Sequence, residues 1–338
     1  MPTVVYVSCA DERQIVGFEL DPAGGTLREI GRVTVPGSDA PSPSSLPLAV
    51  SPDRKWLYAA LRSEPFPVAT YAIEAGGSLR HAGTARLADS MCYLATDPAG
   101  VRLFAASYGG NKVAVSAIAG GIVGETLQVI ATPPKAHCIL PDPDGRFVYA
   151  ACLGGDVILA QRFDATGLDP TPNPAVRTRA GAGPRHLAFG QGGRRLYCVN
   201  ELDGTVNAYE RDASTGALME IQSVSALPHP VSGNAAAADI HLTPDGRFLY
   251  ASLRTTNTLA AFGVDPATGR LNPLGHVPSE LNPRGFAIEP EGKFLLCAGM
   301  DSGMVATYAL DAETGALTRT SAVRAGAGAN WVEALEFP

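Results

Sequence analysis

A short pattern recurs seven times along this chain, at intervals of 45 to 53 residues. In its clearest copies, such as residues 142–149 and 243–250, a turn containing proline leads into an apolar and aromatic run. Proline presets φ for the turn, and the run that follows has strand composition. A repeat of this length is typical of β-propeller blades, so seven copies predict seven blades. The copies are centred on Tyr6, Tyr58, Phe104, Tyr149, Tyr197, Tyr250 and Leu296.

A second turn pattern alternates with the first. Asp, Thr and Gly recur in it, as in Asp265–Leu271 and Asp311–Leu317, and a turn of this kind joins two antiparallel strands. Segments of alternating pattern between the two turns, such as Val206–Tyr209 and Val305–Tyr308, are predicted third strands. No segment has the periodicity of a helix, so the pattern predicts an all-β protein built from four-stranded blades.

The two ends of the chain fall in complementary phases of the repeat. Residues 4–8 begin in the phase of a second strand, and residues 330–337 end in the phase of a first strand. We therefore expect one blade to be built from both termini, because this pairs strands that would otherwise be open edges. The prediction is a single domain, residues 1–338, folded as a seven-bladed β-propeller closed by pairing of its N- and C-terminal strands.

Composition argues against two classes of partner for such a ring, nucleic acid and membrane. The formal net charge is −7, and no basic stripe is present for nucleic acid. Hydrophobic residues make up 46% of the chain, but no run reaches the length of a membrane span. The repeat begins at Val4, which leaves no room for a signal peptide. We expect a monomeric cytoplasmic protein that binds neither nucleic acid nor membrane.

Six cysteines occur without the paired spacing of a zinc site or a redox couple. Four of them lie one or three residues after the aromatic position of the repeat, which indicates strand packing. Buried, unreactive thiols in a reducing compartment are the expectation.

Aligning the blades places polar residues at one end of the predicted channel. Counting six residues back from the proline position of each turn, which Gln191 occupies in one blade, gives the start of an inner strand: Leu46, Cys92, His137, Arg185, Ala238 and Arg284. Counting four residues forward from each signature aromatic gives the end of a second strand: Ala10, Arg62, Tyr108, Leu153, Glu201, Arg254 and Met300. First and second strands are antiparallel neighbours, so both sets are expected on one face of the ring.

Four arginines beside one or two carboxylates, in a net-acidic protein, predict a local positive site for an anionic ligand. The set is rich in arginine and poor in acids, so no metal ion or other cofactor is expected. Structural roles remain open for Asp239, which could hold an arginine or an inter-blade amide, and for His241, which lies farther along its strand. The candidate site contains His137, Arg185, Glu201, Arg254, Arg284, His186, Asn200, Asp239, His241, Arg62 and Tyr108.

Four ordered motifs resemble the seven-bladed propeller lactonases typified by bacterial 6-phosphogluconolactonase, a superfamily that includes the fungal carboxymuconate lactonizing enzymes. The motifs are Gly181–His186, Tyr197–Leu202, Ala237–Arg247 and Pro283–Phe286, and the resemblance runs from Val4 to Trp331. It implies that His137, Arg185 and Glu201 are catalytic, and that the partner is a small anionic sugar lactone.

Hydrolysis of 6-phosphoglucono-δ-lactone is therefore the expected activity. Arg185, assisted by Arg254, is expected to stabilise the oxyanion as water adds. His137 is favoured over Glu201 as the base, with Glu201 orienting it or a substrate hydroxyl. The remaining candidates are expected to bind substrate: Arg284 and Arg62 as the anion clamp, together with His186, Asn200, Asp239, His241 and Tyr108.

The chain departs from the family pattern before its Ala-Ala-Asp-Ile-His motif. It has Asn234, Ala235 and Ala236 where the family tends to carry a basic and a bulky aromatic residue, and Ala136 replaces a common cysteine. Three alternatives stay open: a lactonase for unphosphorylated aldono- or aldaro-lactones, a carboxymuconate-type lactonizing cycloisomerase, and an interaction propeller of the WD-repeat kind. Against the last, the Trp-Asp blade signature is missing.

Overall fold

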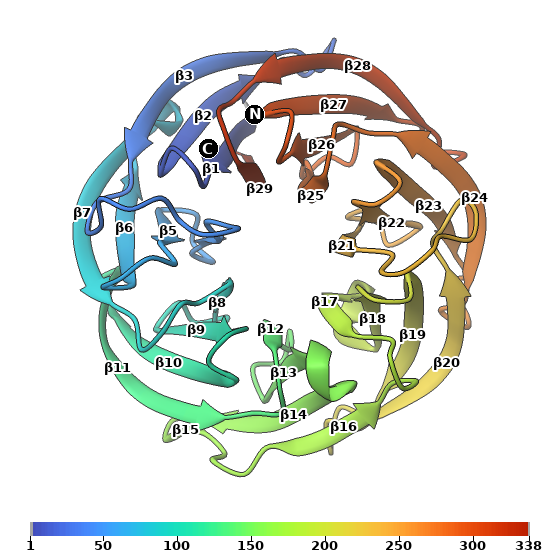
Figure 1. Cartoon of the computed structure of the whole chain (residues 1–338), viewed down its shortest axis with the longest axis horizontal. Helices are drawn as coiled ribbons and strands as arrows, with labels where there is room; N and C mark the ends of the chain where they lie inside the picture. The colour runs from blue at the N-terminus through green and yellow to red at the C-terminus, as the bar shows by residue number, and fades with distance from the viewer. Residues whose placement is uncertain (1–2, 337–338) are drawn as a thin grey trace.

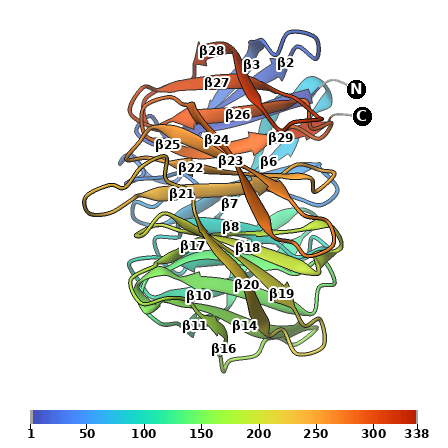
Figure 2. The ribbon, with the colours of Figure 1, turned by 90° about the vertical axis from the view of Figure 1, so that its right-hand side faces the viewer.

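Seven antiparallel sheets form a ring around a central channel, in a computed structural model that describes residues 3–336 (Figure 1). The predicted all-β propeller is therefore confirmed. Residues 1–2 and 337–338 lie outside the described part, and with them Phe337 of the predicted closing strand. Figure 2 shows the ring from its edge, where the strands of successive blades cross the field one above another.

Strands follow one another from the channel to the rim within each blade. The inner strands are β4 (Leu48–Val50), β8 (Tyr93–Thr96), β12 (Ala136–Pro141), β17 (Pro184–Phe189), β21 (Ala237–Leu242), β25 (Pro283–Ile288) and β29 (Ala329–Glu336). The second strands are β1 (Thr3–Cys9), β5 (Trp56–Ala60), β9 (Arg102–Ser107), β13 (Phe147–Cys152), β18 (Arg195–Asn200), β22 (Phe248–Leu253) and β26 (Phe294–Gly299).

The third and outer strands complete the blades. The third strands are β2 (Gln14–Leu20), β6 (Pro67–Ile73), β10 (Lys112–Ala119), β14 (Val157–Asp164), β19 (Thr205–Arg211), β23 (Thr258–Val264) and β27 (Met304–Leu310). The outer strands are β3 (Leu27–Thr34), β7 (Leu79–Arg86), β11 (Ile122–Ala131), β15 (Gly167–Leu168), β16 (Asn173–Arg177), β20 (Leu218–Ser225), β24 (Leu271–Pro278) and β28 (Leu317–Arg324). Both β15 and β16 pair with β14.

Helical structure in residues 3–336 is limited to three short 3₁₀ turns: η1 (Ala75–Gly77), η2 (Leu153–Gly155) and η3 (Gln191–Gly193). No helix in that range is long and apolar enough to cross a membrane.

Both ends of the chain build one blade. Strand β1 lies between β2 and β29, and its Tyr6 is paired with Gly17 on one side and Glu333 on the other. The predicted closure is therefore confirmed. Pairing the ends satisfies backbone groups that two open strands would expose.

The hydrophobic core lies between adjacent blades. One cluster, for example, joins Phe248 and Tyr250 of β22 to Phe286 and Leu295 of the following blade. All six cysteines are free and buried, as the repeat predicted.

The two repeats of the sequence meet in one hydrogen bond between neighbouring blades. The Tyr250 hydroxyl donates to the carbonyl of Gly315, 2.7 Å away in the next blade. Gly315 has φ of 71°, and a Cβ there would lie 2.4 Å from the ring of Phe248, so the turn requires glycine. The same bond joins Tyr6 to Gly77, Tyr58 to Gly121, Tyr149 to Gly216 and Tyr197 to Gly269.

Replacing Tyr250 by Phe is expected to lower the free energy of unfolding by about 1 kcal/mol, since it leaves the Gly315 carbonyl without its donor. Tyr209→Phe is the matched control. Tyr209 is equally buried, but its hydroxyl has no hydrogen-bond partner in residues 3–336, so its loss should cost nothing. Urea unfolding of both variants measures the difference, and equal midpoints would contradict the inter-blade bond.

Candidate active site

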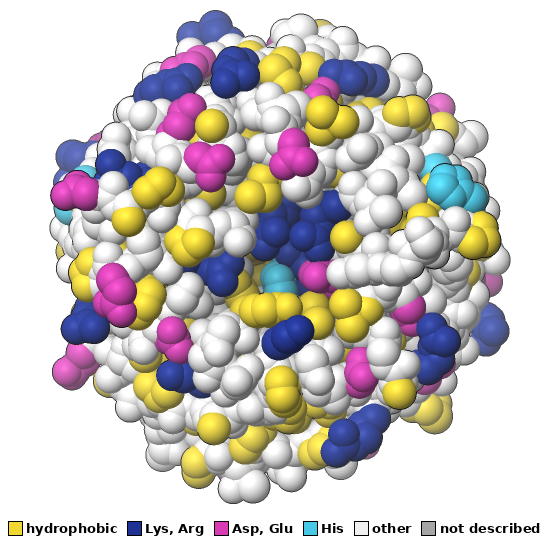
Figure 3. All heavy atoms as spheres, viewed as in Figure 1, with side chains coloured by type: hydrophobic (Ala, Val, Ile, Leu, Met, Phe, Trp, Pro, Cys, Tyr) yellow, Lys and Arg dark blue, Asp and Glu magenta, His cyan; other side chains and the backbone are white. Residues whose placement is uncertain are grey.

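Three site residues lie at irregularities in the inner strands. In each of β12, β17 and β25, one residue is skipped where the inner strand pairs with the second strand of its blade. The skipped residues are His137, Arg185 and Arg284. A bulge leaves its residue outside the ladder and re-aims its side chain. All three line one cavity in the channel. Figure 3 shows this mouth of the channel as a central hollow in which basic side chains gather beside a histidine and an acidic side chain.

The blade that closes the ring contributes a residue that the sequence analysis missed. The register of β29 also shifts, around Asn330, which is buried and lines the same cavity. Its Oδ1 accepts from the Leu46 backbone N–H at 3.0 Å, and its Nδ2 donates to the Gly328 carbonyl at 2.7 Å. No turn proline follows this strand, so the count from proline had no reference there. Aligning the closing strand with the other inner strands would have placed Asn330 beside the channel.

Arg185 is held on three sides. It is 1% exposed. Its Nε donates to Glu201 Oε2 at 2.8 Å, while its Nη1 donates to the Ala238 carbonyl and to His186 Nε2, the latter at 3.1 Å. Its Nη2 makes no hydrogen bond with any residue of the described range. One nitrogen of a fixed guanidinium is therefore left for a ligand.

Glu201 is shared by two arginines. Its Oε2 also lies 3.0 Å from Arg254 Nη2, an ion pair that lacks hydrogen-bond alignment. Burial alone would raise the pKa of Glu201, but Arg185, Arg254 and Arg284 outweigh it and hold that pKa below its usual value. Burial and Arg185 lower the pKa of Arg254 to about 10, which leaves it charged at neutral pH.

Arg284 has no protein counter-ion. Within residues 3–336 its guanidinium makes neither a hydrogen bond nor an ion pair. Burial, followed by the charges of Arg185, Arg254 and Arg62, lowers its pKa well below the usual value. Arg62 nearby also lacks a carboxylate partner in this range, and donates instead to the hydroxyls of Ser45 at 3.1 Å and Ser90 at 3.3 Å. An anion bound between them would supply the missing charge.

His137 is buried, and its Nδ1 has no hydrogen-bond partner among the described residues. Burial and the charge of Arg185 lower its pKa well below 6.5, so the ring is neutral at pH 7. Tyr108 packs edge-on against it, with ring centroids 5.7 Å apart. The Nζ of Lys135, a mouth residue that the sequence analysis did not single out, lies 5.4 Å from the Tyr108 ring centroid. The hydrogen bond and ion pairs of the Glu201 carboxylate in residues 3–336 are with Arg185 and Arg254, not with His137.

His186 and Asp239 are joined at 2.7 Å, from Nδ1 to Oδ1. Burial and Arg185 lower the pKa of His186 to about 4, so this ring is neutral too. Both of its nitrogens are engaged by protein, because Nε2 accepts from Arg185.

Two predicted substrate contacts lie elsewhere. Asn200 is fully buried, and its amide donates to Thr205 Oγ1 and Asn207 Oδ1 inside its own blade. Asn200 is the last residue of its strand, and Glu201 follows it in the turn. His241 lines a separate cavity farther down the channel, where it contacts Asp239 Oδ2 at 3.2 Å. Neither side chain lines the cavity that contains Arg185.

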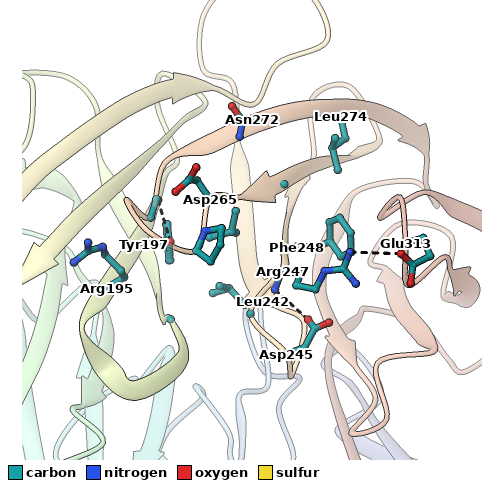
Figure 4. A pocket seen from close by; sticks show the side chains of 16 residues that line it. Arg195, Tyr197, Leu242, Asp245, Arg247, Phe248, Asp265, Asn272, Leu274 and Glu313 are labelled. Atoms are coloured by element: carbon teal, nitrogen blue, oxygen red, sulfur yellow. Dashed lines mark hydrogen bonds and ion pairs between the residues drawn. The ribbon is translucent and has the colours of Figure 1, made fainter.

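A pocket of about 680 Å³ lies outside the channel, between the blades of β17–β20 and β21–β24 (Figure 4). Its charged groups support turns and blade contacts. Arg195 donates to the Thr268 carbonyl at 3.2 Å, Asp265 accepts from backbone N–H groups of its own turn, and Arg247 lies 3.9 Å from Glu313. The channel mouth, where arginines lack counter-ions, is the better candidate for chemistry.

Residues 3–336 contain no group of three or more His, Cys, Asp or Glu side chains placed to hold a metal ion. The chemistry open to this mouth is anion binding and proton transfer, with arginines to stabilise negative charge and a neutral histidine to accept a proton.

Comparison with known proteins agrees with this geometry. The family described as "Lactonase, 7-bladed beta-propeller" matches residues 4–334. A 6-phosphogluconolactonase from Pectobacterium carotovorum subsp. carotovorum (strain PC1) is 42% identical over 291 residues, covering 86% of this chain and 85% of the relative. The 6-phosphogluconolactonase of Serratia proteamaculans (strain 568) is 38% identical over 337 residues, covering 99% of both.

Among solved structures, the periplasmic gluconolactonase of Pseudomonas aeruginosa superposes with a TM-score of 0.89 at 26% identity, covering 100% of both chains. Fold and site thus define a propeller enzyme of the lactone-hydrolysing class. The chain belongs to the seven-bladed β-propeller lactonase family.

Proposed function

We propose that this enzyme hydrolyses 6-phosphoglucono-δ-lactone to 6-phosphogluconate. The observation that carries the proposal is the absence, in residues 3–336, of any protein counter-ion for Arg284, in a mouth where Arg185 and Arg254 already share Glu201. A substrate that carries a phosphate away from its reacting carbonyl fits this arrangement. The relatives named 6-phosphogluconolactonase support the same substrate.

Binding uses the unpaired charges. Arg284, with Arg62 beside it, holds the phosphate, since a guanidinium donates several N–H groups to phosphate oxygens. Holding this end fixes the lactone ring over the cavity that Arg185 and His137 line.

Hydrolysis then proceeds by attack of water on the lactone carbonyl carbon. His137 takes a proton from the water as the new C–O bond forms, and the carbonyl oxygen becomes an oxyanion facing Arg185 Nη2, with Arg254 adding its charge. Collapse of the intermediate breaks the bond to the ring oxygen, which takes the proton back from His137. The single ring-opened product carries a new hydroxyl and a carboxylic acid that ionises at neutral pH.

Glu201 serves this reaction through the arginines. It neutralises part of their charge and fixes the planes of two guanidinium groups, which keeps the donors in place before substrate arrives. Its lowered pKa and engaged Oε2 make it the weaker candidate for the base.

An unphosphorylated sugar lactone is the second candidate substrate. The similarity to a periplasmic gluconolactonase favours it, as does the small-residue segment Asn234–Ala236 beside the mouth. A lactonizing cycloisomerase would use the same arginines to hold a dicarboxylate.

We further propose a monomer located in the cytoplasm. Six free, buried cysteines support a reducing compartment. Light scattering of the purified protein tests the first statement, and cell fractionation against a periplasmic marker tests the second.

The substrate is tested by acid release at neutral pH from fresh 6-phosphoglucono-, glucono- and aldaro-δ-lactones, with spontaneous hydrolysis subtracted. We expect kcat/KM to be at least about 100-fold higher for the phosphorylated lactone, because a charged clamp contributes about 3 kcal/mol. A preference for gluconolactone would contradict the phosphate assignment. Activity that chelators abolish would contradict a metal-independent mechanism.

Two arginine variants separate binding from chemistry. Arg185→Gln should lower kcat about 100-fold or more with little change in KM, since its contact forms in the transition state. Arg284→Gln should instead raise KM about 10-fold or more and change kcat less, since it removes uniform binding. Steady-state kinetics of the two variants give the comparison. The reverse pattern would exchange the two roles.

The pH dependence tests His137. A base whose pKa is lowered keeps its neutral, active form as the pH falls through 6.5. The acid limb of kcat is therefore expected well below pH 6.5. It should be lost, together with most of kcat, in His137→Gln, because an amide does not titrate. An acid limb at or above pH 6.5 in the wild-type enzyme would rule out a buried, neutral His137 as the base.

A further inference from the structure

Asp239 and His186 line the same cavity as Arg185, and their side-chain polar atoms are all hydrogen-bonded to protein groups. The Asp239 carboxylate accepts four hydrogen bonds. Oδ1 accepts from His186 Nδ1 at 2.7 Å and from the Ile240 backbone N–H at 3.0 Å. Oδ2 accepts from the Phe286 backbone N–H at 3.1 Å and from His241 Nε2 at 3.2 Å. A carboxylate so fully engaged is part of the scaffold.

This carboxylate decides which nitrogen of His186 carries the proton. The Arg185 guanidinium can only donate, so His186 Nε2 must accept at their 3.1 Å contact. The proton of the neutral ring then sits on Nδ1 and is donated to Asp239. The opposite tautomer would set an N–H against the Arg185 Nη1–H and a lone pair against the carboxylate.

We propose that Asp239 and His186 are positioning residues, which fix the plane of the Arg185 guanidinium so that Nη2 alone meets the substrate. Together with the Ala238 carbonyl and Glu201 they occupy Nη1 and Nε. The inference rests on the proposed role of Arg185, and it replaces the expectation that His186 and Asp239 bind substrate.

The first test is the tautomer itself, which needs no variant and no substrate. Nitrogen-15 NMR of histidine-labelled wild-type enzyme should show His186 protonated at Nδ1 and unprotonated at Nε2 at pH 7. Assignment comes from the resonance lost in His186→Gln. Protonation at Nε2 would overturn the proposal, whatever the activity of the enzyme.

The second test measures kcat and KM of His186 variants. The substrate is the lactone that the wild-type enzyme hydrolyses fastest. His186→Leu removes the acceptor for Arg185 and should lower kcat about 100-fold with KM within about 3-fold. His186→Gln, whose amide oxygen can stand near the position of Nε2, should recover at least about 10-fold of that loss. A rise in KM with kcat retained would instead mark His186 as a substrate contact.

Asp239→Asn tests the carboxylate. Either orientation of the amide points its NH₂ at a backbone N–H, of Ile240 or of Phe286, so the variant should show a changed His186 tautomer and a lowered kcat. Ser252→Ala is the matched control, because Ser252 Oγ accepts only the Asp239 backbone N–H, and its kcat should stay within about 2-fold. If Arg185→Gln retained its kcat, the proposed function would fail, while the tautomer measurement would still decide the positioning.

Discussion

The hydrogen bond from a second-strand tyrosine to a turn glycine of the next blade is the contact on which the ring depends. In the Tyr250 to Gly315 bond, one end is the aromatic of the first sequence repeat and the other is the glycine of the second. Five of the seven blades donate this bond, and the other two second strands have Phe104 and Leu296 at the position, which carry no hydroxyl. Strand β1 pairs with β29, and its Tyr6 donates the same bond to Gly77, so the closing blade is joined to the blade that follows it and the inner strands keep fixed positions around one channel.

That rigidity allows a concentration of positive charge that a flexible site would not hold. Arg185 and Arg254 share the single carboxylate of Glu201. Burial and the charges of Arg185, Arg254 and Arg62 lower the pKa of Arg284. The positive charges of the mouth are therefore in place before an anion binds. The folded ring offsets the unfavourable free energy of holding these like charges close together. Burial and the charge of Arg185 lower the pKa of His137 and keep its ring neutral, which suits a proton acceptor.

Much of this was predictable from spacing alone. The repeat determined blade number, closure and the face on which Arg185 and Glu201 meet, because those follow from strand pairing. Spacing could not assign Asn200, since its side chain faces into the blade while Glu201 lies beyond the strand end. Nor could it predict that bulges re-aim His137 and Arg185, or that Asn330 joins them without a turn proline. Hydrogen-bond partners such as Asp239 for His186 depend on side-chain directions that only the folded ring defines.

The central claim is that Arg284 binds the phosphate of the substrate. Calorimetric titration of the product, 6-phosphogluconate, tests it without the complication of spontaneous lactone hydrolysis. The wild-type enzyme should bind 6-phosphogluconate at least about 10-fold more tightly than gluconate, and Arg284→Gln should lose that difference. Equal affinity of the wild-type enzyme for the two acids, or an unchanged preference in Arg284→Gln, would contradict it.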